Sequence, residues 1–498
     1  MDFLTFSDSA KFAQAAINLL KGKSLTITHS FFSTNLLDSF QSNSLFSVNF
    51  PPLPSWLLSL LFRFFPATDT NIAIFGLVFL AFSALIVFLI GKKLHSTVAG
   101  LLTSVFFLSS LFFQEYALNF ASEIPFTLLI LLFTYFILLP KGWKLLSTLP
   151  LVALFFTRQQ AAVFLGAVLL TLLVVFLTSK ISNKKKVAFI GALFLLAGVG
   201  LVVDRFTPIS ILPTKIFGSF NIGAGSNFGT YIRGGDYQSL SLFGLASKIF
   251  YNLYNFIKAP SRLLSPILFF LFMLGLFIKP KKRELTQFKF FTVISLLAFL
   301  LAASATLPNA RYVHPVIPLV IILAATALVD LVKVVPKKLK KLVLVVLSLF
   351  IIFPTIGHLT LDARSRSQQF NTDQPPVYRH ISSIMADHIE PGHLIITNLD
   401  AWAAWYEGLT TMWFPLQIDM LAGYENKIDY IVITNYLEDD GDFALGEWSQ
   451  VVYAPEDLRS QWLIDNFDLL TTLYLTPEQV YENQPYQGTI LINRRLVN

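Results

Sequence analysis

The stretch of sequence that decides the fold is an uncharged apolar run over residues 71–91, closed by two lysines at 92–93: NIAIFGLVFLAFSALIVFLIGKK. About 20 apolar residues are enough to cross a hydrocarbon core of about 30 Å as an α-helix. The whole chain of 498 residues is 54% hydrophobic and only 13% charged, whereas soluble chains are about 25% charged. The composition therefore predicts an integral membrane protein and excludes a cytosolic or secreted globule.

Similar apolar runs recur along the chain and predict a polytopic α-helical bundle of about ten transmembrane helices over residues 71–356. The expected spans cover 71–91, 97–113, 124–139, 143–157, 160–179, 186–204, 263–279, 288–307, 313–333 and 339–356. The fourth and fifth are also compatible with one helix broken at Arg158, since a charge inside a span is costly.

Basic residues fall in alternate loops, and short loops rich in Lys and Arg stay in the cytoplasm. These loops contain Lys92 and Lys93; Lys141 and Lys144; Lys180 and Lys184 to Lys186; Lys279 to Arg283; and Lys333 to Lys341. Residues 1–70, the long loop at 205–262 and the tail at 357–498 then face outward across a plasma (inner) membrane. The net charge is +20 over residues 1–356 and −13 over the tail, which argues against nucleic acid as a partner.

The first 70 residues must reach the outside ahead of the first recognisable span. Within them, Ser7 to Leu20 reads as an amphipathic helix, too short to cross a membrane. We therefore expect that one transmembrane helix is encoded upstream of Met1. An in-frame apolar run of about 20 residues in the upstream DNA would support this expectation, and its absence would exclude it.

Most acidic residues of the membrane part lie on the outer side, and Asp8, Glu115 and Glu123 sit beside apolar segments that hold them at the surface. Carboxylates in such places can act as a general base or hold a divalent cation. Solvated loop acids are the plain alternative. No other cofactor is indicated, and the chain has no Cys.

The outer side is poor in basic residues, and Arg158, Arg233 and Arg311 stand at or near the ends of spans. Arginine is suited to phosphate because its planar fork donates two hydrogen bonds at once. We expect these residues, with Tyr312, to bind a phosphate group. Anchoring at the membrane interface is the alternative for Arg311 and Tyr312, because both residue types favour that depth.

The acidic tail changes to short β-branched runs separated by helical stretches, which predicts an extracytoplasmic α/β domain over 357–498. The expected strands lie at 393–398, 429–435, 471–475 and 488–493. The domain is also rich in aromatic residues, and these favour core packing over sugar stacking or membrane docking. They include Trp402, Trp405, Tyr406, Trp413 and Phe414.

Four motifs on the outer face occur in the order found in a known family. They are Asp8 on its helix before Leu20-Lys21-Gly22-Lys23; Phe50-Pro51-Pro52-Leu53-Pro54-Ser55-Trp56; Ala121-Ser122-Glu123-Ile124-Pro125-Phe126; and Arg311-Tyr312 with Pro315 and Pro318. Over residues 5–340 the chain resembles the GT-C superfamily of polytopic glycosyltransferases, closest to its bacterial protein O-mannosyltransferase and aminoarabinose-transferase branch. The sequence departs from the family in lacking its first helix, in having Ser9 after Asp8, and in having Phe50 where some members carry a basic residue.

The resemblance implies a hexosyl- or pentosyltransferase that moves a sugar from a polyprenyl-phosphate donor to an acceptor hydroxyl of a lipid, glycan or protein. Asp8 would be the catalytic base, Arg311, Tyr312, Arg233 and Arg158 would bind the donor phosphate, and Glu115 and Glu123 would hold a metal or the acceptor. The competing class is a polytopic transporter or flippase for a lipid-linked saccharide, and a scaffold or receptor is a weaker third. Transporters bury charges near the midplane, whereas here they sit at the ends of spans, which favours an enzyme at the membrane surface.

Overall fold

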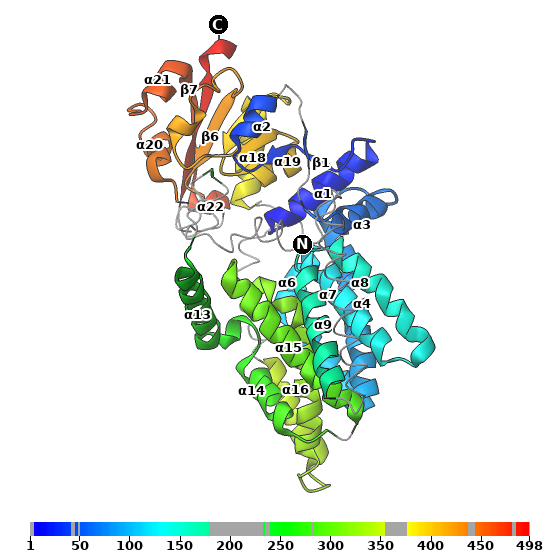
Figure 1. The fold of residues 1–498 in the computed structure, drawn as a ribbon. Coiled ribbons are helices and arrows are strands. Elements are labelled where there is room, and N and C mark those ends of the chain that lie inside the picture. The colour runs from blue at the N-terminus through cyan, green and yellow to red at the C-terminus, as the bar shows by residue number, and fades with distance from the viewer. Residues whose placement is uncertain are drawn as a thin grey trace.

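The chain forms a helical body and a domain that contains a β-sheet (Figure 1), which we call the outer domain because the sequence predicts that it faces outward. The computed structural model describes residues 4–40, 45–47, 50–178, 233–234, 240–280, 282–353, 376–436, 444–480 and 485–497. The expected span at 186–204 and most of the expected loop at 205–262 lie outside these residues. The N-terminal helix α1 (Ser7–Leu20) lies at the junction between the two parts.

Most helices of the body follow the expected apolar runs. Residues 242–258, in the expected loop at 205–262, form a further helix, and the helix at 111–118 extends past the expected span at 97–113. The helices of the body are α4 (Asp69–Leu94), α5 (Thr97–Leu108), α6 (Leu111–Leu118), α7 (Glu123–Leu138), α8 (Thr148–Phe155), α9 (Ala161–Leu177), α13 (Leu242–Lys258), α14 (Pro266–Phe277), α15 (Arg283–Ala305) and α16 (Ile317–Val332). Residues 340–353 are helical as well. The expected fourth and fifth spans are separate helices, because the chain breaks between Phe155 and Ala161 around Arg158.

Three helical segments in the described part of the chain are long and apolar enough to cross a membrane. They are α4, α15 and His314–Val332, which combines a 3-10 turn with α16. A fourth span results when α5 and α6, bent by 61°, are counted as one. Five further apolar helices are shorter, at 10–17 residues. The polytopic character is therefore confirmed, and the total of about ten spans stays a prediction.

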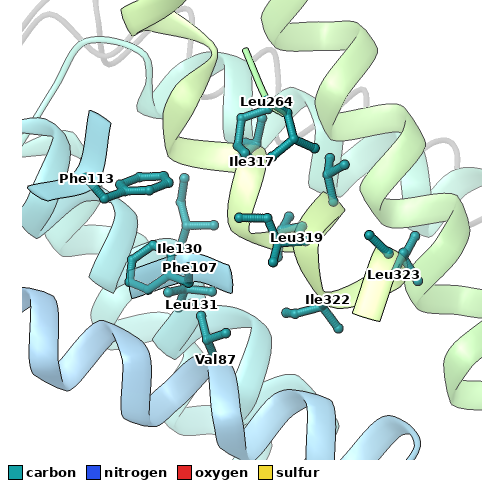
Figure 2. Close-up of a cluster of buried hydrophobic side chains, with 14 of the residues drawn as sticks. Val87, Phe107, Phe113, Ile130, Leu131, Leu264, Ile317, Leu319, Ile322 and Leu323 are labelled. Atoms are coloured by element: carbon teal, nitrogen blue, oxygen red, sulfur yellow. The ribbon is translucent and has the colours of Figure 1, made fainter. Parts of the chain in front are cut away.

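The core of the helical body is built around α16, which is buried on nearly every side (Figure 2). Ile317, Leu319 and Leu323 on this helix belong to the same buried hydrophobic cluster as Phe113 from α6 and Ile130 from α7. A helix that is apolar all round belongs inside a bundle.

Close approach between α4 and α6 depends on one glycine in the helical body. A Cβ at Gly76 would lie 1.8 Å from the carbonyl oxygen of Ala117. Such a contact is impossible for real atoms, so any other residue at this position would push the two helices apart. Because α6 leads into the turn before α7, Gly76 also helps to fix where α7 begins.

The outer domain has a six-stranded sheet in the order β2-β5-β4-β6-β8-β7. Its strands are β2 (His29–Ser30), β4 (Leu394–Thr397), β5 (Thr410–Trp413), β6 (Tyr430–Thr434), β7 (Phe467–Leu475) and β8 (Tyr486–Asn493). Strands β2, β5, β4 and β6 run parallel to one another. Strand β8 is antiparallel to both of its neighbours, β6 and β7. The helices of the domain are α18 (Val377–His388), α19 (Asp400–Glu407), α20 (Ser449–Tyr453), α21 (Gln461–Asn466) and α22 (Pro477–Val480).

The N-terminal region belongs to this same sheet, although the sequence suggested two separate regions. Strand β2 pairs in parallel with β5, with His29 opposite Thr411, and the Gln14 side chain on α1 donates to the Ala404 carbonyl on α19. The remaining N-terminal elements are β1 (Thr26–Ile27), α2 (Thr34–Ser39), β3 (Phe46–Ser47) and α3 (Leu53–Phe62). Residues 4–62 therefore connect the outer domain to the helical body.

A second connection lies at Asp69, the first residue of α4. Its carboxylate accepts hydrogen bonds from the Trp405 indole (2.9 Å), the Tyr406 hydroxyl (2.8 Å) and the Leu4 amide (3.1 Å). We call these four residues the Asp69 joint. Of the five aromatic residues noted in the sequence, Trp402, Trp413 and Phe414 are buried in the domain as expected, whereas Trp405 and Tyr406 attach the domain to the helical body.

Candidate active site

Helix α1 brings Asp8 to the junction between the two parts. One face of the helix is apolar and buried, with Phe12 and Ala13 among its residues, while Asp8 lies in the first turn, where a carboxylate favours the helix dipole. The entry to the helix is fixed by the Asn119 side chain, whose oxygen accepts from the amide of Thr5 at 2.6 Å. The position of Asp8 is thus set by the turn that precedes α7.

The same turn places Glu123. Phe120 has a φ of 46°, the only positive value at a non-glycine residue in the described segments. This left-handed conformation is costly for a bulky residue. Packing offsets the cost, because the Phe120 ring is fully buried against Phe75 and Phe79, with ring centroids 5.0 and 5.2 Å away. The turn ends at Ser122 and directs Glu123 into the junction at the start of α7.

Four charged side chains from four distant segments meet there, and we call them the charge cluster: Asp8, Glu123, Arg158 and Arg311. Glu123 is completely buried and accepts from both arginines: Arg158 Nη1 lies 2.6 Å from Oε1, and Arg311 Nη2 lies 3.1 Å from Oε2. Arg311 also pairs with Asp8 at 3.0 Å. The Asp8 side chain keeps 44% of its surface exposed, against 0% for Glu123, so Asp8 is the accessible carboxylate of the cluster.

Both guanidinium groups have additional support. Arg158 donates to Ser122 Oγ at 2.7 Å and to Gln160 Oε1 at 3.0 Å, and it faces the Tyr312 ring at 5.7 Å. Arg311 lies 4.9 Å from the centre of the Phe6 ring. These contacts are typical of arginines held in one orientation, because the fork geometry fixes several bonds at once.

The segment that carries Arg311 is anchored by His314. Its Nε2 lies 2.8 Å from the Arg262 carbonyl oxygen, which can only accept, so this nitrogen carries the proton. Nδ1 then accepts from the Tyr116 hydroxyl at 2.6 Å, and Phe112 stacks on the ring at 4.3 Å. Arg311 is therefore connected through His314 to both α6 and the chain before α14.

A cavity of about 310 Å³ opens beside the charge cluster. Its walls come from α1, β2 and the residues just before it, the Phe50-Pro51 entry to α3, the break between α8 and α9, and the segment before α16. The lining includes Asp8, Lys11, Phe12, His29, Phe31, Phe50, Ser122, Arg158, Gln160 and Tyr312. The volume is at the lower end of the range for small-molecule sites.

The charges around the cavity set the ionisation of Asp8. Burial alone would raise the pKa of this carboxyl, but the Arg311 guanidinium, with Lys11 and Arg158, outweighs that effect and holds the pKa below its usual value. Asp8 is therefore ionised at neutral pH and can accept a proton. Lys11, Arg158 and Arg311 carry three positive charges against two negative charges on Asp8 and Glu123, which leaves one positive charge in excess.

The structure brings together five of the seven residues singled out in the sequence: Asp8, Glu123, Arg158, Arg311 and Tyr312. Arg233 lies elsewhere, with its guanidinium 4.0 Å from the Phe414 ring and donating to the carbonyls of Ala444 (2.6 Å) and Pro415 (3.2 Å). Glu115 lies on α6, next to the Tyr116 that anchors His314.

The sequence suggested that Glu123 holds a metal ion or the acceptor. In the structure its carboxylate is paired with two arginines, Arg158 and Arg311. Within the described residues, no group of three or more His, Cys, Asp or Glu side chains is placed to hold a metal ion. Several polar residues that line the cavity were not singled out in the sequence, among them Lys11 and His29. Lys11 could have been predicted from the sequence, because it follows Asp8 by three residues and therefore lies on the same face of the helix.

A family model matches part of the chain. Residues 49–203 match a family model described as dolichyl-phosphate-mannose-protein mannosyltransferase. That match covers less than half of the chain, and it includes Glu123 and Arg158. No curated protein sequence matches the chain significantly.

The similarity to solved structures extends over nearly the whole chain. ArnT from Cupriavidus metallidurans bound to undecaprenyl phosphate has a TM-score of 0.52 at 13% identity, covering 98% of this chain and 94% of ArnT. The Archaeoglobus fulgidus oligosaccharyltransferase in complex with zinc and sulfate has a TM-score of 0.57 at 12% identity, covering 95% and 68%. The same archaeal enzyme, AglB, in complex with an inhibitory peptide and a dolichol-phosphate gives 0.51 at 12%, covering 97% and 70%.

The chain has the fold of the GT-C superfamily. The resemblance noted in the four sequence motifs is thereby confirmed at the level of the fold. Within the GT-C fold, the charge cluster and the cavity lie where the outer domain meets the helical body. Both parts contribute, because β2 of the outer sheet and the break before α9 of the helical body line the same cavity.

Proposed function

We propose that the protein is a membrane glycosyltransferase that moves a sugar from a polyprenyl-phosphate donor to an acceptor hydroxyl at the outer face of a plasma (inner) membrane. The observation that carries the proposal is the accessible Asp8 carboxylate in a cavity that Arg158 also lines, with Arg311 paired to Asp8 at 3.0 Å. The GT-C fold supports it, as do the lipid phosphates bound by ArnT and AglB. Whether the sugar is a hexose or a pentose, and whether the acceptor is a lipid, glycan or protein, is left open by the proposal.

The donor would place its phosphate against the positive side of the cavity. The excess of one positive charge matches the single negative charge of a phosphodiester. Arg158 and Lys11 line the space, and Arg311 lies beside it in its pair with Asp8. The polyprenyl chain would extend along the apolar helices, because they are the parts that face lipid. Tyr312 would support this site by fixing Arg158 rather than by carrying charge.

In the proposed reaction Asp8 accepts the proton of the acceptor hydroxyl, whose oxygen forms a bond to the sugar C1. The bond between C1 and the phosphate oxygen breaks, and its electron pair leaves with the polyprenyl phosphate. Arg311 and Arg158 would stabilise the negative charge that develops there. A direct displacement of this kind inverts the configuration at C1. Glu123 has no part in proton transfer and instead holds the two guanidinium groups in place.

The test uses purified protein in liposomes with undecaprenyl phosphate carrying radiolabelled mannose, glucose, galactose, arabinose or aminoarabinose, and a membrane extract as acceptor. Transfer of label with equimolar release of undecaprenyl phosphate is the expected result. Asp8→Asn should lower the rate by about 10²- to 10⁴-fold, the usual contribution of a general base. The exposed acid Asp38, on α2, provides the matched control Asp38→Asn, which should leave the rate unchanged.

Two outcomes would contradict the proposal. Near-normal turnover by Asp8→Asn would eliminate Asp8 as the base. Movement of the labelled lipid across the bilayer without release of undecaprenyl phosphate would indicate the alternative function, a transporter or flippase for a lipid-linked saccharide.

A further inference from the structure

The proposed reaction leaves one buried polar group of the cavity without a role. His29 on β2 lines the cavity and is only 1% exposed. Its Nδ1 lies 3.0 Å from Gln14 Oε1, whereas its Nε2 has no hydrogen-bond partner in the described part of the chain. A buried polar atom left without a partner costs about 1–3 kcal/mol, so a site that keeps one calls for an explanation.

The neighbours of Gln14 determine which His29 nitrogen carries the proton. Gln14 Nε2 donates to the Ala404 carbonyl at 2.9 Å, and Gln14 Oε1 accepts from the Thr28 amide at 2.9 Å. A carbonyl only accepts and an amide only donates, so the orientation of the Gln14 side chain is fixed. Its oxygen can only accept from His29, and Nδ1 is therefore the protonated nitrogen. Nε2 is left as a bare acceptor.

The imidazole also stays neutral at physiological pH. Burial, and then the positive charge of Lys11, hold the pKa of His29 well below its usual value. The position of the ring is fixed by the sheet, since His29 pairs with Thr411 on β5. His29 thus places a rigid, uncharged hydrogen-bond acceptor in the wall of the cavity, and a group that reaches Nε2 must be a donor.

We infer that Nε2 of His29 accepts a hydrogen bond from a hydroxyl group of a neutral sugar bound in the cavity, which makes His29 a specificity-determining residue. This inference rests on the proposed function and narrows its substrate class. An amino sugar would bring a second cation beside Lys11, whose ammonium group lines the same cavity and lies 4.4 Å from the Phe31 ring. Phe12, Phe31 and Phe50 also line the cavity, and aromatic rings suit the apolar face of a sugar.

The experiment measures binding in an Asp8→Asn background, so that turnover does not consume the ligand. The probes are undecaprenyl phosphate alone and undecaprenyl phosphate carrying mannose, glucose, galactose, arabinose or aminoarabinose. We expect at least one neutral conjugate to bind about tenfold more tightly than undecaprenyl phosphate alone, the value of one good hydrogen bond. Aminoarabinose should give no such gain.

Three variants identify His29 as the source of the gain. His29→Phe keeps a planar ring without the acceptor and should lose the tenfold gain, with the affinity for undecaprenyl phosphate unchanged. His29→Gln places an acceptor near the position of Nε2 and should retain most of the gain. His388→Phe is the matched control, because His388 is exposed on α18 and should have no effect. Thermal unfolding checks that each variant is folded.

The hydroxyl could belong to the donor sugar or to a sugar of the acceptor, and kinetics separate these sources. If His29→Phe leaves donor binding intact but raises KM for the acceptor about tenfold with an unchanged kcat, the acceptor supplies the hydroxyl and the inference holds. Unchanged donor affinity together with unchanged KM would overturn it, as would a largest gain with aminoarabinose. Failure of the protein to bind undecaprenyl phosphate at all would instead overturn the proposed function, and the inference with it.

Discussion

Glu123 and Asp69 are two buried carboxylates at the first residues of neighbouring helices, and they hold different kinds of partner. Glu123, with its side chain fully buried, is surrounded by two guanidinium groups. Asp69, at 8% exposure, accepts hydrogen bonds from an indole, a phenol and an amide. The first arrangement keeps charges in a fixed geometry next to a cavity, and the second fastens two parts of the molecule together through neutral hydrogen-bond donors. Burial of a carboxylate therefore does not by itself point to a catalytic site. The chemical nature of the groups that pair with the carboxylate is the more informative observation.

The largest expected effect comes from removing the charge of Glu123. Glu123→Gln takes from Arg158 its paired carboxylate and leaves Arg311 paired with Asp8 alone, and breaking a buried pair in this way costs about 3–5 kcal/mol. Transfer should fall by more than about 10²-fold, because fixed charges that stabilise the transition state contribute at least that much. The measurements are thermal unfolding and the rate of label transfer. Unchanged transfer would show that the guanidinium groups need no support from Glu123.

Arg311→Gln should change the pH dependence of transfer. In the wild type the guanidinium keeps the pKa of Asp8 below its usual value, so the base remains ionised well into the acidic range. Without Arg311 this pKa rises, and the rate then begins to fall at a higher pH as the pH is lowered. The pH profile of kcat/KM checks this shift, with Arg311→Lys as the control that keeps the charge. An acidic limb that does not move would exclude Asp8 as the titrating base.

The substitution Asp69→Leu tests whether the Asp69 joint is structural and has no part in transfer. It removes the acceptor for three donors, so we expect a loss of about 3 kcal/mol of unfolding free energy. Transfer by the fraction that remains folded should stay close to the wild-type rate, since the charge cluster is untouched. Limited proteolysis between the helical body and the outer domain would report the loosened joint. Loss of transfer as large as that of Glu123→Gln would end the distinction between the two carboxylates.

The smallest expected effect belongs to Tyr406→Phe. This change deletes one donor from the Asp69 joint and leaves the aromatic ring in place. It should cost about 1 kcal/mol with no change in the rate of transfer, and denaturant unfolding can detect a difference of this size. A loss several times larger would mean that Tyr406 holds the joint together almost alone.

Much of the fold could be predicted from the sequence because its signals are local. The apolar run at 71–91 became α4, the runs at 288–307 and 313–333 became α15 and α16, and three of the four expected strands begin and end within a few residues of β4, β6 and β8. In each case a single segment contains both the hydrophobic pattern and the residues that end it.

The candidate site was predictable only in part. Topology placed Asp8, Glu123, Arg158 and Arg311 on one side of the membrane, which is why the residues were found. It could not show that Glu123 would pair with both arginines, because nothing local distinguishes a carboxylate bound by guanidinium groups from one awaiting a metal. Arg233 satisfied the same criterion of position, yet its guanidinium is held by Phe414 and two carbonyls of the outer domain.

Strand β2 and the Asp69 joint could not be predicted, for a different reason. Two residues are too few to show an alternating pattern, and the partner of β2 lies in a separate part of the chain. The hydrogen bonds of Asp69 reach Trp405 and Tyr406, which the sequence presents only as aromatic residues of a mixed domain. Contacts over such separations depend on the finished fold and leave no local trace.

The pairing of β2 with β5 also has a consequence for biosynthesis. His29 is translated about 380 residues before its partner Thr411, and at 5–20 residues per second a ribosome takes about 20–80 s to cover that distance. During that time β2, which carries His29, has no β5 to pair with. An exposed strand edge can pair with another strand instead. The cavity would therefore be incomplete until the last quarter of the chain has been made, so an unfinished chain could not carry out the proposed reaction.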